Sequence, residues 1–466
     1  MSELAPARRV PRWAVACLLM ILAFDVAWRW HTIGPTPISR PFEGWLVRSG
    51  ETEPLDCDEA AYAYMARRML RGDVLYRDLI ENKPPLGYWL YTLAVALGGA
   101  NEMTVRIMAM PYVLGTIGPV WWIGLRLGGP ATACLAALVY AIASADPYVF
   151  GNGSNMEHFL NFVSVASLAL MLDVSRRRVF AAGVVVGLAS LVKQVAAVEL
   201  IVYGVYLALP RASRSLRQRA GDVMSLALGF AAPWGIALGV LIAQGAGPAA
   251  YEGMVTFARA TATDVPPPPN SPPLLVRLVT GNADPEGKLP PPFGTTNYYV
   301  WWAAGLWPLW LVSVAATLRM VFFRSPSPST PHPALPHKGG GEESKPSPLV
   351  GEGRVGGESQ ARRLVGVWII SAWIQVLLPA QFWPHYYLLA LPGVALSVSL
   401  WLVDAIRGLR RRPVPLGIVA LILVAALVWS LRIQARDYLG RTPEEITSEF
   451  KGGKQWVALR SLGRQM

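Results

Sequence analysis

Long apolar runs recur along the chain from Trp13 to Trp429, and they constrain its fold more than any other feature. A helix of about 20 mostly apolar residues is long enough to cross a bilayer. Charged residues make up only 15% of the sequence, whereas a soluble globular chain carries about 25%. The chain is therefore predicted to be an all-α integral membrane protein, and a soluble cytosolic enzyme is excluded.

The apolar runs predict about eleven transmembrane helices. They cover residues 13–30, 104–125, 130–147, 158–174, 179–193, 195–209, 222–243, 298–318, 364–380, 386–404 and 414–431. The stretch 86–98 is short and follows Pro84-Pro85. It is predicted to be re-entrant or interfacial, because a further span would invert the orientation of every later helix.

Arginine clusters between the runs predict the orientation, because loops rich in arginine stay on the cytoplasmic side. With the N-terminal arginines inside, the alternation of spans brings each later cluster to the cytoplasmic face. These clusters comprise Arg126, Arg176 to Arg178, Arg211, Arg214, Arg217, Arg219, Arg319, Arg324, Arg362, Arg363, Arg407 and Arg410 to Arg412. The net charge of +12 is explained by these loops, so nucleic-acid binding is not predicted.

This topology divides the chain into segments. A cytoplasmic N-terminus (1–12) precedes a membrane domain (13–323) that has outer loops at 31–103 and 244–297. A cytoplasmic low-complexity insertion follows at 324–363, then further membrane helices at 364–431 and a short periplasmic tail at 432–466. The insertion is rich in Pro, Gly and Ser and is predicted to be disordered, because it cannot bury a core.

The two outer loops carry different signals. Residues 59–70 have the spacing of an amphipathic helix within the first loop. The second loop contains proline runs at 266–269, 272–273 and 290–292, which favour extended polyproline II geometry. Such a loop could serve as a lid or as a plain connector, and the sequence leaves both interpretations open.

Most polar residues near the spans, other than arginines, fall on the outer side. Charges at membrane depth or at span ends are costly and are functional candidates by default. The set consists of Asp56, Asp58, Glu59, Glu81, Lys83, Arg106, Asp146, Glu157, His158, Lys193 and His385. Lys83 and Lys193 are the only lysines in the first 280 residues. The pattern predicts an aqueous site on the outer membrane face.

These residue types suit group transfer from a phosphate-activated donor to a hydroxyl. A carboxylate such as Asp58 or Glu157 can take the proton of the acceptor hydroxyl. A lysine or arginine can neutralise the charge on a departing phosphate. The sequence contains no P-loop or dinucleotide motif, and the bacterial periplasm lacks nucleotide sugars. A lipid-linked donor, delivered through the membrane, is therefore predicted.

At these residues the sequence resembles the polytopic GT-C glycosyltransferases, and within them the protein mannosyltransferase and aminoarabinose transferase group (glycosyltransferase family 39 and its bacterial relatives). The matching pieces lie in residues 50–200 and in the 380s. They are Asp58-Glu59-Ala60 with Tyr62, Asn82-Lys83-Pro84-Pro85 with Gly87-Tyr88-Trp89, Gly99-Ala100-Asn101 with Val105-Arg106, Glu157 with Phe159, Leu191-Val192-Lys193-Gln194, and His385-Tyr386-Tyr387 with Leu391-Pro392.

The resemblance implies a GT-C fold and roles for individual residues. Asp58 corresponds to the catalytic acid of the first outer loop, and Glu157 to the second acid. Donor or phosphate binding is implied for Lys83, Lys193, His385 and Arg106. Substrate binding or support is implied for Glu59, Tyr62, Gln194 and Tyr386. The implied reaction is an inverting transfer of sugar from a polyprenyl-phosphate donor to a periplasmic acceptor at the bacterial inner membrane.

Two positions depart from the aminoarabinose branch. An acidic residue there precedes the loop lysine and helps hold a metal, but this chain has Asn82. The metal content is therefore unknown: no cofactor is required and a divalent metal stays open. His158 replaces the proline common after the second acid. The sugar and the acceptor (lipid, glycan or protein) do not follow from these residues.

Other interpretations apply to single residues and to the whole chain. Glu157 could cap its helix, Lys193 could snorkel, and His385 could belong to an aromatic belt. Arg106 could anchor a span end. The alternative function is a transporter or flippase, although no repeated half is visible and the polar residues lie at span ends. A surface-polysaccharide polymerase or ligase is disfavoured, because the acids lie in the first outer loop.

Overall fold

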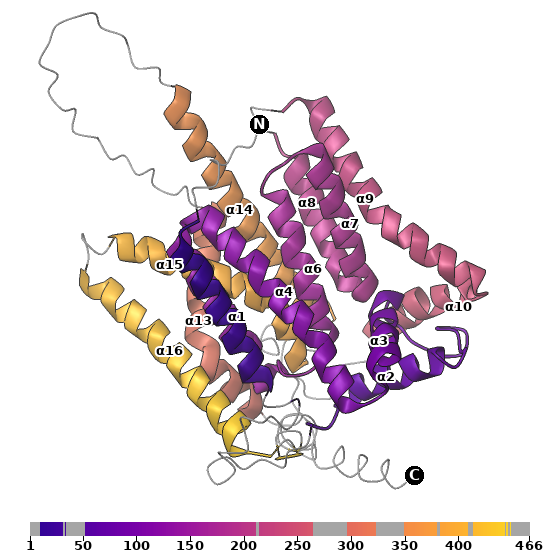
Figure 1. Cartoon of the computed structure of the whole chain (residues 1–466). Coiled ribbons are helices and arrows are strands. Elements are labelled where there is room, and N and C mark those ends of the chain that lie inside the picture. Colours follow the sequence, from indigo (N-terminus) through magenta and orange to yellow (C-terminus); the bar gives the residue numbers. More distant parts are fainter. Residues whose placement is uncertain are drawn as a thin grey trace, which may run out of the picture.

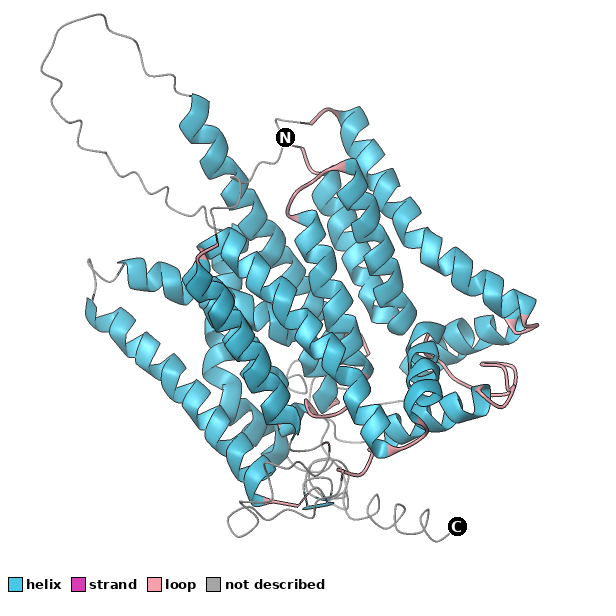
Figure 2. Ribbon diagram, viewed as in Figure 1, coloured by secondary structure: helices cyan, strands magenta, loops and turns pink. Residues whose placement is uncertain are grey.

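The computed structural model describes residues 10–30, 33, 52–210, 214–263, 296–322, 349–379, 383–408 and 413–442, with 444, 445 and 448. Over these residues the secondary structure is almost entirely helical, and an isolated bridge joins Leu75 and Leu79 (Figure 2). The predicted all-α class is confirmed. The proline runs of the second outer loop and residues 324–348 of the insertion lie outside the described residues.

Each predicted span corresponds to a helix of the structure (Figure 1). The helices are α1 (Arg12–Trp30), α4 (Glu102–Gly128), α5 (Pro130–Ser144), α6 (Met156–Met171), α7 (Arg176–Val192), α8 (Val198–Ala208), α9 (Leu216–Ala243), α13 (Thr296–Phe322), α14 (Leu349–Leu377), α15 (Leu391–Gly408) and α16 (Pro413–Gly440). Among the described residues, 5 helices are long and apolar enough to cross a membrane, and further apolar helices are shorter. The membrane character is supported, whereas the count of eleven spans stays a prediction.

Two helix ends differ from the predicted segment bounds. The helix α14 begins at Leu349, directly after Pro348, so the last part of the predicted insertion continues into this helix. The helix α16 extends to Gly440, past the predicted span end at residue 431. The N-terminal residues 1–9 lie outside the described part of the chain.

Shorter helices gather at one end of the bundle, where α2, α3 and α10 lie together in Figure 1. Their bounds are α2 (Cys57–Met69), α3 (Pro85–Gly98), η2 (Pro147–Val149), η3 (Gln194–Ala197), α10 (Gly247–Tyr251), the π-helix η4 (Glu252–Phe257), α11 (Ala258–Thr263) and η5 (Pro384–Ala390). The predicted amphipathic helix at 59–70 is confirmed as α2, and the stretch 86–98 forms α3.

The arginine clusters meet acids at the other end of the helices. Arg126, near the end of α4, lies 3.1 Å from Asp173, and Arg178 pairs with the same carboxylate. Arg362 of α14 pairs with Asp404 of α15. Arg106 and Arg126 occupy opposite ends of the helix α4, about 30 Å apart at 1.5 Å per residue. These arginine clusters therefore lie at the same end of the helical bundle. Their location on the cytoplasmic side stays a prediction.

The buried core centres on α5, which packs against α1, α4, α15 and α16. Its alanine-rich sequence lets these neighbours approach, and most of its residues from Thr132 to Ser144 are buried. The helices α7 and α9 approach closely at Gly183 and Gly229, where an added Cβ would overlap the facing backbone. This packing fixes the starts of α6 and η3, which carry residues of the site.

Candidate functional site

Three acidic residues at the start of α2 have different hydrogen-bond partners. Asp56 caps the helix: its Oδ1 accepts from the Glu59 amide (2.9 Å), and the Glu59 carboxylate accepts from the Asp56 amide (3.0 Å). This reciprocal pair is a capping box and satisfies amides that the first turn leaves open. Asp58 is not part of it. Its Oδ2 accepts instead from the Tyr62 hydroxyl at 3.0 Å, and its side chain is 35% exposed.

Glu59 and Arg106 belong to a buried network that joins α2, α4 and the loop 145–155. Arg106 Nη2 lies 3.1 Å from Glu59 Oε2, and both side chains are fully buried. Arg106 also donates to the carbonyls of Pro54 (2.8 Å) and Asn152 (3.0 Å). A buried arginine satisfied in this way holds backbone segments in place. Its position supports the anchoring interpretation rather than the predicted binding of donor phosphate.

The other predicted charged residues come together. Lys193 Nζ forms an ion pair with Glu157 Oε1, whose side chain is 1% exposed. His385 Nε2 lies 3.9 Å from Glu157 Oε1 and 4.0 Å from Asp58 Oδ2. Two carboxylates from distant parts of the chain thus flank one imidazole. Lys193 reaches this position because α7 ends at Val192 and Lys193 itself is extended.

Each of the two lysines lies over an aromatic ring. Lys83 Nζ lies 5.2 Å from the centroid of the Tyr62 ring, and Lys193 Nζ lies 4.5 Å from that of Tyr386. Cations over aromatic faces are stabilised by the ring quadrupole. Gln194 donates to the carbonyl of Asn82, which links η3 to the loop that carries Lys83. Each of these contacts joins residues that the sequence predicted for one site.

A cavity of about 580 Å³ opens beside this cluster. Its lining residues are Asn82, Lys83, Glu157, Lys193, Gln194, Val195, Met254, Val255, Ala258, Arg259, Gln375, Leu378, Pro379, Tyr386 and Leu389. Three basic side chains occur in this lining, and much of the remaining wall is apolar. The cavity is therefore suited to an anionic group attached to a hydrocarbon.

Among the polar residues of the cavity wall, sequence reasoning missed Arg259 and Gln375. Arg259 comes from α11, in the outer loop that was interpreted as a lid or connector. Gln375 comes from α14, where its amide also contacts Glu199 Oε1 at 3.3 Å. A single arginine within an apolar helical stretch was the available signal for Arg259. No comparable signal distinguishes Gln375 from other polar residues within spans.

Charges around Asp58 set its protonation state. Burial disfavours the charged carboxylate, but Lys83, His385, Lys193 and the Tyr62 hydroxyl outweigh that effect, so its pKa lies below the ordinary value of 3.8. Asp58 is therefore ionised at neutral pH and can accept a proton.

Within the described ranges, no group of three or more His, Cys, Asp or Glu side chains is arranged to hold a metal ion.

A family model described as dolichyl-phosphate-mannose-protein mannosyltransferase matches residues 82–236. The matched region contains Lys83, Glu157 and Lys193. The chain resembles the GT-C glycosyltransferases. This match confirms the predicted resemblance to that family and supports glycosyltransferase activity.

A solved structure extends the likeness to the fold. The archaeal oligosaccharyltransferase AglB from Archaeoglobus fulgidus, in complex with an inhibitory peptide and a dolichol-phosphate, is 13% identical with a TM-score of 0.52. The match covers 97% of this chain and 58% of AglB, so the chain spans little more than half of that protein. ArnT from Cupriavidus metallidurans bound to undecaprenyl phosphate is 17% identical, with a TM-score of 0.48. That match covers 97% of this chain and 72% of ArnT.

Proposed function

We propose that this chain moves a sugar from a polyprenyl-phosphate donor to a hydroxyl of a periplasmic acceptor at the bacterial inner membrane. The observation that carries the proposal is the grouping of Asp58 and Glu157 around His385 beside the cavity. Carboxylates next to paired cations suit acid–base chemistry coupled to departure of a phosphate. The acceptor is a lipid, a glycan or a protein.

The cavity supports a lipid-linked donor. Its apolar wall includes Met254, Val255 and Leu378, which can pack against an isoprenoid chain. Lys83 and Arg259 lie in the same lining and can neutralise a phosphate. The mannosyltransferase family match and the dolichol-phosphate held by AglB, which shares the fold, are in keeping with such a donor.

The proposed reaction is a direct displacement. The Asp58 carboxylate takes the proton of the acceptor hydroxyl, and the hydroxyl oxygen attacks the anomeric carbon. The bond between that carbon and the phosphate oxygen breaks, and its electron pair leaves with the phosphate. One displacement inverts the configuration of the anomeric carbon. The lysines stabilise the charge that develops on the leaving group, and Glu157 holds Lys193 in position.

The decisive experiment compares the native protein with Asp58→Asn in membranes supplied with radiolabelled polyprenyl-phosphate sugars. The variant is expected to lose transfer by a factor on the order of 10² or more, because a general base contributes about that much. Asp78→Asn serves as the matched control, since Asp78 is a surface acid of the same loop paired with Arg77. Equal transfer by native protein and Asp58→Asn would remove Asp58 from the chemistry.

A further inference from the structure

The first span carries a charged pair that the proposed reaction does not use. Asp25 and Arg29 lie one turn apart on α1 and are 0% and 4% exposed. Charged groups buried within a membrane span are costly and are usually retained for a function. Neither residue lines the cavity. Their partners show what the pair can do.

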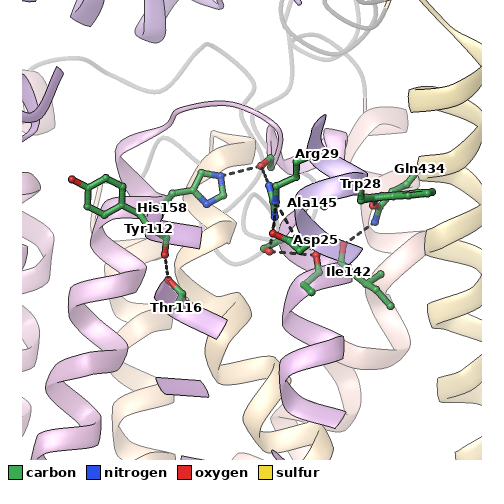
Figure 3. A network of polar contacts seen from close by, with 12 residues as sticks. Asp25, Trp28, Arg29, Tyr112, Thr116, Ile142, Ala145, His158 and Gln434 are labelled. Atoms are coloured by element: carbon green, nitrogen blue, oxygen red, sulfur yellow. Dashed lines mark hydrogen bonds and ion pairs between the residues drawn. The ribbon is translucent and has the colours of Figure 1, made fainter. Parts of the chain in front are cut away.

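Arg29 uses its whole guanidinium group to bind three segments. Its Nε donates to both Asp25 oxygens at 3.1 and 3.0 Å. Its Nη2 donates to Ser144 Oγ at 2.8 Å, at the end of α5, and its Nη1 donates to the carbonyl of Gly151. Figure 3 shows Arg29 next to Asp25, with His158 nearby. The planar fork of an arginine can make these contacts together, whereas a lysine cannot.

Two side chains contact the carbonyl oxygen of Gly151: that of Arg29 and that of His158, the residue after Glu157. His158 Nε2 lies 3.0 Å from this oxygen, so the tautomer with a proton on Nε2 donates to it (Figure 3). His158 is fully buried. A Cβ at Gly151 would overlap the carbonyl oxygen of Ser144, so only glycine permits this approach. The chain of contacts therefore runs from α1 through Gly151 to the start of α6.

The loop 145–155 also contacts His385 of the candidate site. Phe150 has a positive φ of 56° and stacks on the His385 ring, with centroids 6.0 Å apart. A strained φ persists only where the surroundings hold it. Arg106 holds the same loop from another side through the carbonyl of Asn152. The positions of Glu157 and His385 thus depend on a loop tied by two buried arginines.

We propose that Asp25, Arg29 and His158 are positioning residues that fix the loop 145–155 and thereby set Glu157 and His385 relative to Asp58. The inference rests on the proposed function for its catalytic meaning. Asp25 orients and neutralises Arg29, Arg29 fixes the Gly151 carbonyl, and His158 ties that carbonyl to the first turn of α6.

The test uses Arg29→Lys, which keeps the charge but loses the fork. The matched control is Trp28→Phe, because Trp28 is the neighbouring residue and its indole Nε1 donates to Gln434 of α16 at 2.8 Å. Amide hydrogen exchange of peptides covering 145–158 is measured on the full chain in nanodiscs, together with kcat and the donor KM. Size exclusion and thermal unfolding confirm that both variants are folded.

Arg29→Lys is expected to raise exchange in 145–158 and to lower kcat on the order of tenfold or more, with the donor KM nearly unchanged. Trp28→Phe is expected to change neither. His158→Gln, which can still donate to Gly151, is expected to retain more activity than His158→Ala. Unchanged loop exchange in Arg29→Lys, or an unchanged kcat, would overturn the inference. Absence of transfer by the native protein would instead overturn the proposed function, while the exchange result would still decide whether the tether exists.

Discussion

At the scale of single residues, the site is governed by which charges share a buried space. Lys83 and Lys193 lower the pKa of Asp58 and keep its carboxylate ionised although the side chain is partly buried. Glu157 and Lys193 neutralise one another in a position that water scarcely reaches. Both arrangements predict how activity and stability respond when one partner is removed.

Lys83→Met is expected to shift the acid limb of kcat to higher pH. Removal of the Lys83 charge, the largest electrostatic cause that lowers this pKa, leaves the desolvation of Asp58 less compensated, so its pKa rises and the carboxylate is protonated earlier as the pH falls. In the native protein the pKa of Asp58 lies below its ordinary value, so the stability that its ionised form contributes is lost as the pH falls through that lowered pKa. The measurement is kcat against pH at saturating donor. Lys83→Arg, which keeps the charge, should leave the limb in place.

Lys193→Met is expected to destabilise the protein by about 3–5 kcal/mol, because it leaves the buried Glu157 carboxylate without its lysine partner. The double variant Lys193→Met/Glu157→Gln removes both charges and should recover most of the stability without recovering transfer. Thermal unfolding in detergent and the transfer assay are compared across the four proteins of this cycle. Equal stability of the single and double variants would argue against a tightly coupled pair.

At the scale of elements, helix packing depends on small residues at points of contact. The helices α7 and α9 cross at Gly183 and Gly229, and the facing carbonyl of Phe180 leaves no space for a side chain at Gly229. In membranes such small residues let backbones approach closely. Lys193 directly follows the last residue of α7, so the packing of α7 against α9 affects the position of Lys193 in the site.

Gly229→Ala is therefore expected to destabilise the bundle by about 1–3 kcal/mol, the usual range for overpacking. Gly239→Ala is the matched control, because Gly239 lies in the same helix and has open space around its Cβ position. Both substitutions replace glycine within a helix, so their intrinsic helix propensities cancel. Unfolding temperatures of the two variants measured side by side decide the point; a loss of stability in Gly239→Ala of the same size would contradict it.

At the scale of the whole molecule, the two ends of the bundle differ in chemistry. One end holds arginine–aspartate pairs such as Arg362–Asp404, and the other holds the cavity and the short helices α2 and α3. The predicted topology places the first end in the cytoplasm and the second in the periplasm. An exposed thiol at the start of α2 gives a direct test.

Cys57 is expected to react with a membrane-impermeant maleimide from the periplasmic side of intact cells. Burial, followed by the Asp58 and Asp56 carboxylates, raises the pKa of this thiol to about 11. Labelling should therefore be slow at pH 7 and faster at pH 9, since the thiolate is the reactive form. Ser175→Cys, at the start of α7 near the arginine pairs, should label only after the cells are opened. Labelling of both sites from outside would invalidate the topology.

Sequence alone determined the positions of the helices and the identity of several residues in the site. An apolar run long enough to cross a bilayer is a local property, so each predicted span has its helix. The capping pair Asp56 and Glu59 is equally local. Alternation of spans then brought Glu157, Lys193 and His385 to one end, because each connection reverses the chain.

Only the tertiary structure decided which of these groups meet. Arg106 lies on the predicted outer side, yet its guanidinium is buried against Glu59. Arg259, from a loop without a recognisable motif, lines the cavity, and Arg29 reaches Gly151 across 122 positions of sequence. Such partnerships depend on how helices pack side by side. That packing arises from shape and small residues spread over the whole chain, which no local pattern encodes.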